Sequence, residues 1–275
     1  MSDRKRIEKI IDRLDLGWSD FYHSETKAAD NKILVLSENV RGRTLQEKLD
    51  KMELATKVLD IDESMSFSIF NKKGAKHPSA QIYAVDFPSD LRASIYLLLG
   101  GYYRQSILCL RNWLEMRLTG VYFGFINPDQ KHYQEWMRGK RRAPIGQDLI
   151  KKLFSRAEFH KVDKKLKLRE QLRSLQGELS AFTHGAILEK YNLQSETDNV
   201  PRFNPQSIDL WCDFAVRVLR ELVFCYFLAY HQDAFIYLEV EEREAIRKLL
   251  PSEYVKEFER AGIFGKKTTS SGFAK

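Results

Sequence analysis

Residues 89–124 read SDLRASIYLLLGGYYRQSILCLRNWLEMRLTGVYFG, and this stretch decides the fold. Apolar residues recur in it at helical spacing, Pro88 ends the element before it, and Ser89 is a good helix N-cap. As one helix the stretch would be about 54 Å long. Gly100 and Gly101 lie in its middle, and each costs roughly 1 kcal/mol relative to alanine in a helix. Either the helix breaks there, or another backbone crosses closely at that point.

Helical patterns continue on both sides of this stretch and predict an all-α fold. Residues 205–235 follow a three-four apolar rhythm and are expected to be the second central helix of the core. The other segments that we expect to be helical are residues 2–16, 19–39, 44–59, 128–138, 144–154, 161–183, 240–250 and 252–261.

Residues 63–88 carry a different pattern. In SMSFSIF (residues 64–70) apolar residues alternate with serine, and a turn-like NKKGAKHPS separates it from QIYAVDF (residues 81–87). A period of two predicts one short β-hairpin, with an extended connection as the alternative. We therefore divide the chain into an N-terminal helical arm (1–62), this connection (63–88), a helical core (89–262) and a flexible basic tail (263–275).

The formal net charge of +7 on this 275-residue chain is unevenly placed. Residues 138–173 hold thirteen Lys or Arg and four Asp or Glu, a local balance of +9, so the rest of the chain sums to −2. Concentrated positive charge favours an anionic partner, here RNA or DNA, although a solvated helix face is the plain alternative. The candidate nucleic-acid-binding residues are Arg138, Lys140, Arg141, Arg142, Lys151, Lys152, Lys164, Lys165 and Arg169.

Other classes of protein find no support in the sequence. The longest apolar run, residues 222–230, has nine residues, whereas crossing a bilayer needs about 20. The N-terminus is charged and lacks a signal-peptide apolar core, so we expect a soluble cytoplasmic protein without membrane contact. Cys109, Cys212 and Cys225 have no paired spacing and are interpreted as buried, inert thiols. Metal-binding and nucleotide-binding motifs are absent, so we expect neither a metal nor a cofactor.

The helix expected over residues 161–183 has two distinct faces. Its apolar stripe consists of Leu168, Leu172, Leu175, Leu179 and Phe182, and its polar stripe consists of Arg169, Arg173, Gln176, Ser180 and His184. A stripe of this kind places a cation and an imidazole near one phosphodiester. His184 would be the general acid or base, and Arg173 would stabilise developing negative charge. The alternative is a solvent-facing stripe whose terminal histidine caps the helix.

Arg111 and Glu115 lie one turn apart in the long apolar stretch, with Arg104 on the same face. Two roles stay open for this pair. It either forms a structural seam that fixes the register of two core helices, or it orients side chains across a helix–helix interface. The candidate catalytic set is therefore His184, Arg111, Glu115, Ser180 and Arg173.

The segment RNWLE (residues 111–115), followed about sixty residues later by ELSAFTHG (residues 178–185), resembles the HEPN-like helical superfamily. The likeness is to prokaryotic members that end in Leu-Ser-x-x-x-His-Gly, here Leu179, Ser180, His184 and Gly185. It covers about residues 89–235 and implies an up-down helical bundle that often dimerises. Many relatives belong to toxin–antitoxin, abortive-infection or other antiphage systems. Catalytic members cleave RNA without a metal through an Arg-x4–6-His motif.

The chain departs from that motif, because three residues separate Arg156 from His160 and ten separate Arg173 from His184. On one helix the latter pair would lie about 16 Å apart, so an RNase would need Arg111 or a second subunit to supply the cation. Two hypotheses follow. One is a defence or toxin-type protein that engages nucleic acid through its basic surface, with metal-independent RNase activity as its enzymatic form. The other is a non-catalytic helical adaptor or subunit of a larger antiphage assembly, with a homodimer or another protein as its partner.

Overall fold

The computed structural model describes residues 3–14, 28–74, 76–85, 89–182, 201–260 and 263, and within these ranges the protein is helical without a strand. Among the helices described there, none has the length and apolar character needed to cross a membrane. The helices are α1 (Asp3–Leu14), α2 (Ala28–Glu47), α3 (Leu49–Lys73), α4 (Pro78–Val85), α5 (Ser89–Leu99), α6 (Tyr103–Val121), α7 (Gln130–Met137), α8 (Gly146–Leu153), α9 (Ala157–Leu166), α10 (Leu168–Ala181), α11 (Pro205–Tyr230), α12 (Val240–Leu249) and α13 (Ser252–Arg260).

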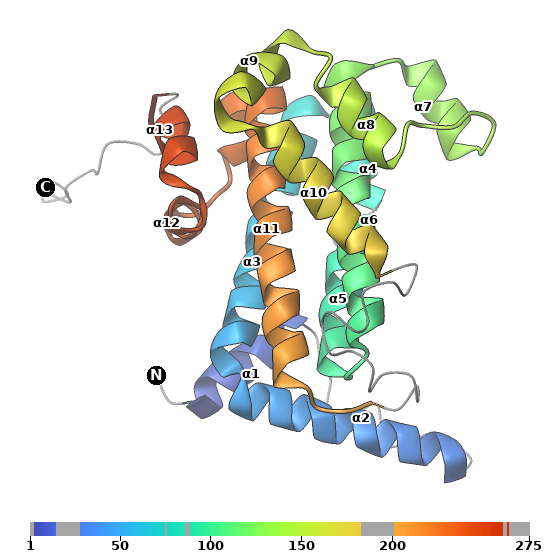
Figure 1. Ribbon diagram of the computed structural model, residues 1–275, viewed down its shortest axis with the longest axis vertical. Coiled ribbons are helices and arrows are strands. Elements are labelled where there is room, and N and C mark those ends of the chain that lie inside the picture. The colour runs from blue at the N-terminus through green and yellow to red at the C-terminus, as the bar shows by residue number, and fades with distance from the viewer. Residues whose placement is uncertain are drawn as a thin grey trace, which may run out of the picture.

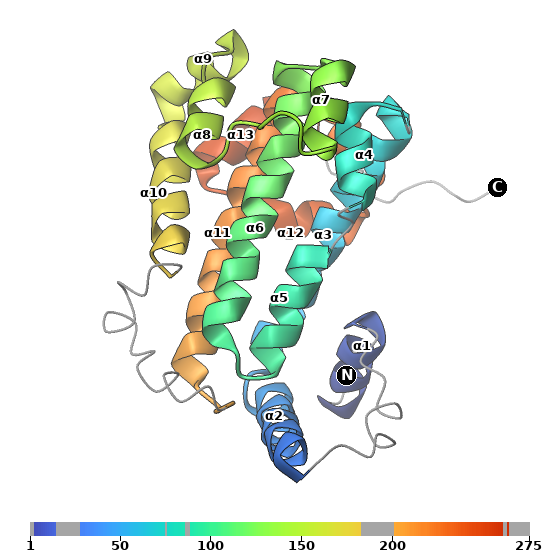
Figure 2. The ribbon, with the colours of Figure 1, turned by 90° about the vertical axis from the view of Figure 1, so that its right-hand side faces the viewer.

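The long stretch that begins at Ser89 is a helical hairpin. Helices α5 and α6 lie side by side and share a turn at one end of the molecule (Figure 2). Gly101 sits in this turn at a φ of +82°, and a Cβ there would come within 3.1 Å of the backbone nitrogen of Arg202. The helix therefore breaks at the glycine pair, and another backbone also crosses closely at that point. The two alternatives raised by the sequence are both true.

Helices α3, α5, α6 and α11 form the long axis of the bundle, with α2 across one end and α7, α8 and α9 at the other (Figure 1). Hydrogen bonds join three of these helices inside the core. The indole of Trp211 in α11 donates to Ser94 Oγ in α5 at 2.7 Å, and Ser94 Oγ donates to the carbonyl of Ser106 in α6 at 2.6 Å. Helix α10 lies obliquely over α6 and α11 and packs against both of them (Figure 1).

The β-hairpin or extended connection expected within residues 63–88 is wrong. Residues 64–70 lie inside α3, a continuous helix of 25 residues, and α4 begins at Pro78. Met65, Ser68 and Ile69 are buried, which is the three-four spacing of a helix face rather than an alternation. Ser68 is accommodated in this core because its hydroxyl bonds to the helix itself: Ser68 Oγ donates to the carbonyl of Ser64 at 2.7 Å. The boundary proposed at residue 62 falls within the same helix.

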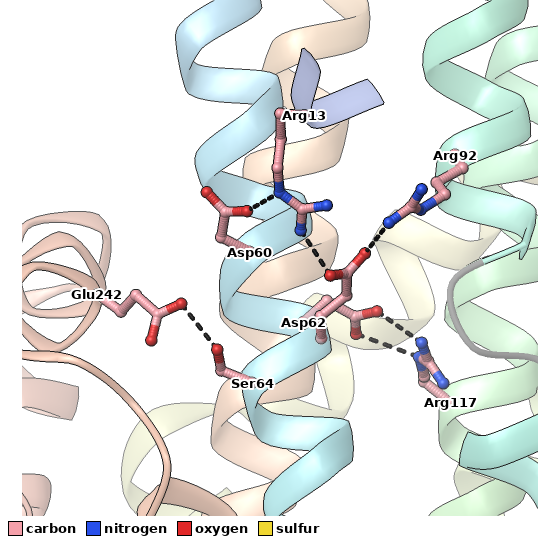
Figure 3. Close-up of polar contacts among 8 residues, drawn as sticks. Arg13, Asp60, Asp62, Ser64, Arg92, Arg117 and Glu242 are labelled. Carbon is pink, nitrogen blue, oxygen red and sulfur yellow. Dashed lines mark hydrogen bonds and ion pairs between the residues drawn. The ribbon is translucent and has the colours of Figure 1, made fainter. Parts of the chain in front are cut away.

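Two arginines of helix α1 form ion pairs with acidic residues of α3. The Arg6 Nε lies 2.7 Å from Glu53 Oε1, and Arg13 pairs with Asp60 and, at 2.5 Å, with Glu63. Figure 3 shows Arg13 reaching down to α3 beside Arg92, which comes from α5. These contacts hold the N-terminal arm against the same helix that lines the core of the bundle.

Candidate functional site

A polar seam runs between α6 and α10, and we define it by Arg111, Glu115, Gln176 and Ser180. The Arg111 Nη2 lies 3.2 Å from Glu115 Oε1, and these two side chains are 26% and 20% exposed. From α10, Gln176 Nε2 donates to Glu115 Oε1 at 3.5 Å and to Ser180 Oγ at 3.4 Å. The arginine and glutamate thus pair with each other and also connect across the helix–helix interface. These contacts fit a structural seam between two helices, whereas the orientation of His184 by this pair stays a prediction.

Arg173 joins this seam through two glutamine side chains. Its Nε donates to Gln147 Oε1 on α8 at 2.7 Å, and Gln147 Nε2 donates to Gln176 Oε1 at 2.5 Å. Gln147 and Gln176 were not among the candidate residues, although Gln176 belongs to the polar stripe of α10. Their role depends on the packing of α8 against α10, which the spacing within one helix does not reveal.

His184, the candidate proton-transfer residue, and Gly185 lie outside the described residues. The chain is described as far as Phe182, whose carbonyl accepts a hydrogen bond from Arg104 Nε at 3.0 Å. Arg104, Arg111 and Glu115 share one face of α6. The described chain before His184 is therefore tied to the helix face that carries the seam.

The helix expected over residues 161–183 is interrupted, which corrects the sequence prediction. Lys167 has a φ of 53° and separates α9 from α10. Asp163 supports this break, because its carbonyl accepts from the Lys167 N–H at 2.9 Å and its carboxylate accepts from the Arg169 N–H at 2.8 Å. A carboxylate that caps the start of a new helix competes with continuation of the previous one.

A cavity of about 630 Å³ lies at this break, and we call it the α10 cationic pocket. Three cationic side chains line it, together with two acids and two neutral polar residues. Its lining consists of Lys167, Arg169, Arg173, Asp163, Glu170, Gln147 and Ser174. Because Arg173 and Gln147 belong both to the pocket lining and to the hydrogen bonds that reach Gln176, the pocket adjoins the seam.

The candidate nucleic-acid-binding residues gather around α7, α8 and α9, at one end of the bundle (Figures 1 and 2). Eight of the nine are exposed, and Arg169 is half-buried. Arg141 lies 3.7 Å from Glu135, and Lys165 pairs with Glu257 at 2.5 Å. Within the described ranges no ion pair engages the side chains of the others, which are Arg138, Lys140, Arg142, Lys151, Lys152, Lys164 and Arg169.

The most buried ion pair of the described chain was missed by the sequence reasoning. Arg117 of α6 holds Asp62 of α3 through two bonds, with Nη2 at 2.6 Å from Oδ2 and Nε at 3.1 Å from Oδ1 (Figure 3). Their side chains are 2% and 0% exposed. A signal was present, because Asp62 falls on the apolar face of α3 beside Leu59 and Met65. A charge on such a face implies a buried partner.

Burial and pairing act in opposite directions on this couple. Burial alone would lower the pKa of Arg117, but the adjacent Asp62 carboxylate outweighs burial and raises that pKa above its ordinary value. Burial raises the pKa of Asp62, and Arg117 opposes that shift. Since both side chains are enclosed, a ligand cannot reach the pair, and its role is to stabilise the fold.

Glu221 is a second buried charge, located on α11. Its Oε1 lies 3.0 Å from Arg220 Nη2, whereas its Oε2 has no hydrogen-bond partner within the described residues. Burial raises the pKa of Glu221 to about 7, and the neighbouring Arg220 limits the shift. The pKa of this carboxyl group therefore lies near neutral pH, well above that of an ordinary glutamate.

The cysteines match the interpretation of buried thiols in two of three cases. Cys212 and Cys225 are buried and Cys109 is half-buried. Burial raises the pKa of all three thiols, that of Cys212 to about 12. In the part of the chain that the structure describes, no group of His, Cys, Asp and Glu side chains converges as metal ligands would.

Comparison with known proteins adds no relative to this description: no family model matches the chain, and neither a curated protein nor a solved structure is significantly similar to it.

Proposed function

We infer that this protein binds nucleic acid through the basic end of its bundle, in the manner of a HEPN-like protein of prokaryotic defence or toxin type. One observation carries the inference. Exposed cations that have no ion-pair partner among the described residues, including Arg138, Lys151, Lys152 and Lys164, gather at the end of the bundle that also holds the α10 cationic pocket.

Most of these cations are available to an anion outside the protein. Lys165 and Arg141 are partly neutralised by glutamates, but most of their neighbours are not. Each Lys or Arg that meets a phosphate releases a condensed counterion, and this release supplies most of the sequence-independent affinity for nucleic acid. A cluster of unpaired cations at one end is therefore suited to a phosphate backbone.

The catalytic form of this proposal uses the polar seam. Arg111 and Glu115 are about a quarter exposed, so a ligand can reach them, and Ser180 is joined to Glu115 through Gln176. Arg111 would supply the cation that an Arg-x4–6-His motif otherwise provides, and His184 would transfer the proton. Cleavage of RNA by this route needs no metal.

The binding proposal is tested by charge reversal at two matched pairs of lysines. Lys151→Glu with Lys152→Glu removes two exposed cations of α8, whereas Lys5→Glu with Lys9→Glu makes the same change on α1, near the opposite end of the bundle. The measurement is fluorescence anisotropy with a short single-stranded RNA and with duplex DNA. We expect the α8 variant to lose about tenfold or more in affinity and the α1 variant to keep most of it.

Two results would overturn the binding proposal. One is an equal loss in both variants, and the other is no binding of RNA or DNA by the wild type at low salt. In the latter case, salt-insensitive association with a protein partner would favour the adaptor hypothesis instead.

Cleavage is tested separately, with RNA incubated in the presence of a metal chelator. The catalytic form predicts that the wild type cuts the RNA and that His184→Ala binds it without cutting. Intact RNA after incubation with the wild type would remove the catalytic form and leave binding in place.

A further inference from the structure

We propose that the α10 cationic pocket is a site for a phosphomonoester, the doubly charged phosphate at the end of a nucleic-acid strand or on a free nucleotide. The strand-end form rests on the proposed nucleic-acid binding. The pocket exists because α9 and α10 meet at Lys167, which turns the chain and opens a cavity of about 630 Å³ against α8.

The three cations of the pocket are available to a ligand. Within the described residues, no ion pair engages Lys167, Arg169 or Arg173. The Nε of Arg169 is buried and has no hydrogen-bond partner there. Arg173 uses its Nε to hold Gln147, which fixes the side chain and leaves its two terminal nitrogens for another acceptor. A guanidinium group that is positioned in this way suits a planar pair of phosphate oxygens.

The acids of the pocket offset these cations only in part. Asp163 is committed to the fold, because its carboxylate accepts from the Arg169 N–H at 2.8 Å and caps α10. Glu170 is exposed in the first turn of α10, where water screens its charge. Three cations beside two acids leave the lining net positive.

The number and charge of the ligand oxygens favour a monoester over a diester. A terminal phosphate carries about −1.5 to −2 charges at neutral pH and offers three strong acceptor oxygens. A phosphodiester within a strand carries one charge and offers two free oxygens. Three cationic side chains line the pocket, two from α10 and one from Lys167 just before it, and they match the terminal group better.

The lining also indicates what the pocket does not recognise. None of the described residues that line it is aromatic, so these residues give a base nothing to stack on. The ligand is therefore held by its phosphate and not by its base sequence. Because Arg173 and Gln147 connect the pocket to the seam, a strand anchored by its end would begin next to Glu115 and Arg111.

The test compares one short single-stranded RNA with a phosphate or a hydroxyl at its 5′ end, and a third copy with a 3′ phosphate. At fixed salt and neutral pH we expect the wild type to prefer a phosphorylated end by about tenfold. Arg169→Gln removes one cation and should abolish that preference, while it weakens the binding of RNA with hydroxyl ends by no more than the loss of one exposed cation does. Lys167→Asn serves as the second variant, because asparagine tolerates the left-handed backbone of this position.

Lys140→Gln is the matched control, since it removes a cation outside the pocket. It should weaken the binding of all three RNAs by a similar factor and keep the preference for a phosphorylated end. A preference that Lys140→Gln abolishes as well would show that the pocket is not its cause, and would overturn the proposal.

A second arm separates the two sources of the phosphate. Adenosine 5′-monophosphate is titrated into the wild type and into Arg169→Gln by calorimetry. If the wild type binds the nucleotide, Arg169→Gln does not, and no RNA end is preferred, then the pocket is assigned to a free nucleotide. If neither a phosphorylated end nor the nucleotide is preferred, the pocket proposal fails, while RNA binding by the exposed lysines is untouched. If the nucleotide binds but no RNA does, the proposed function fails and the pocket stands.

Discussion

Helix α6 carries two arginines six residues apart, each paired with a carboxylate, and the two pairs differ in exposure, geometry and connection. Arg117 and Asp62 are 2% and 0% exposed and are joined by two short bonds (Figure 3). Arg111 and Glu115 are 26% and 20% exposed and lie 3.2 Å apart. The inner pair links two core helices, whereas the outer pair belongs to a seam that solvent reaches.

The difference shows that charged residues of one helix can have separate roles. A buried charge stabilises the fold, and a partly exposed charge can bind a ligand. In the core, removal of one partner leaves the other buried and unpaired, which typically costs about 3–5 kcal/mol. Near the surface, water replaces a lost partner, and a pair contributes about 1 kcal/mol or less. Substitution of a buried residue such as Arg117 should therefore change the free energy of unfolding. Substitution of a partly exposed residue such as Arg111 should mainly change ligand binding.

The largest effect is expected when the inner pair is broken. Arg117→Met leaves the Asp62 carboxylate buried without its partner, so we expect the free energy of unfolding to fall by about 3–5 kcal/mol. Urea denaturation followed by circular dichroism measures this loss. The double variant Asp62→Leu with Arg117→Met should recover part of it, because no charge then stays in the core. A single variant as stable as the wild type would contradict the structural role.

Glu221 is a buried carboxyl group of which only one oxygen is paired within the described residues. Its pKa is about 7 in the folded protein against an ordinary 4.5, so the folded state favours the protonated form. Below pH 4.5 both the folded and the unfolded state are protonated, and the burial of this group costs nothing extra. The cost grows as the pH rises from 4.5 to 7 and is complete above 7, on the order of 3 kcal/mol.

Glu221→Gln removes this titration. We therefore expect the wild type to lose stability relative to the variant as the pH rises from 5 to 8. The unfolding free energy of the variant minus that of the wild type should increase over this range. Urea denaturation at a series of pH values measures that difference. A difference that stays constant over this range would show that Glu221 is ionised throughout.

Two glycines test how tightly each region is packed. A Cβ on Gly120 in α6 would lie 2.5 Å from the ring of Tyr83, whereas a Cβ on Gly177 in α10 would meet nothing within 4 Å. Gly120→Ala should therefore lose about 1–3 kcal/mol through overpacking. Gly177→Ala should gain up to about 1 kcal/mol from helix propensity. Thermal unfolding of both variants checks the opposite signs, and equal shifts would contradict the packing.

The smallest change in stability belongs to the outer pair. Arg111→Gln should cost less than about 1 kcal/mol, because its side chain is partly solvated. The same variant should lose RNA cleavage if the seam is catalytic. Unfolding and cleavage are measured on one preparation. A loss of stability as large as that of Arg117→Met would place Arg111 with the structural residues instead.

Periodicity was enough to place α6, α10 and α11 in helices, because each of them carries an apolar stripe that its own spacing reveals. It also placed Arg111, Glu115 and Ser180 on faces that the structure brings together. These features depend on the spacing of residues within a single helix, which the hydrophobic periodicity of the sequence shows directly.

The errors arose where distant residues decide the outcome. Serines in residues 64–70 resembled the polar face of a strand, but Ser66 and Ser68 are buried in α3, and the Ser68 hydroxyl bonds to that helix. The break at Lys167 depends on the side chain of Asp163 as a cap for α10. The Asp62–Arg117 pair joins residues that are 55 positions apart. The sequence shows two charges on apolar faces without showing that they meet.

The central claim is that the unpaired cations around α7, α8 and α9 bind phosphate groups, and the dependence of RNA affinity on salt tests it most directly. The wild type is titrated with single-stranded RNA at increasing potassium chloride. We predict that the logarithm of the association constant falls linearly with the logarithm of salt, by about 0.7 for each phosphate contacted. An affinity that does not change with salt, or no binding at low salt, would contradict the claim.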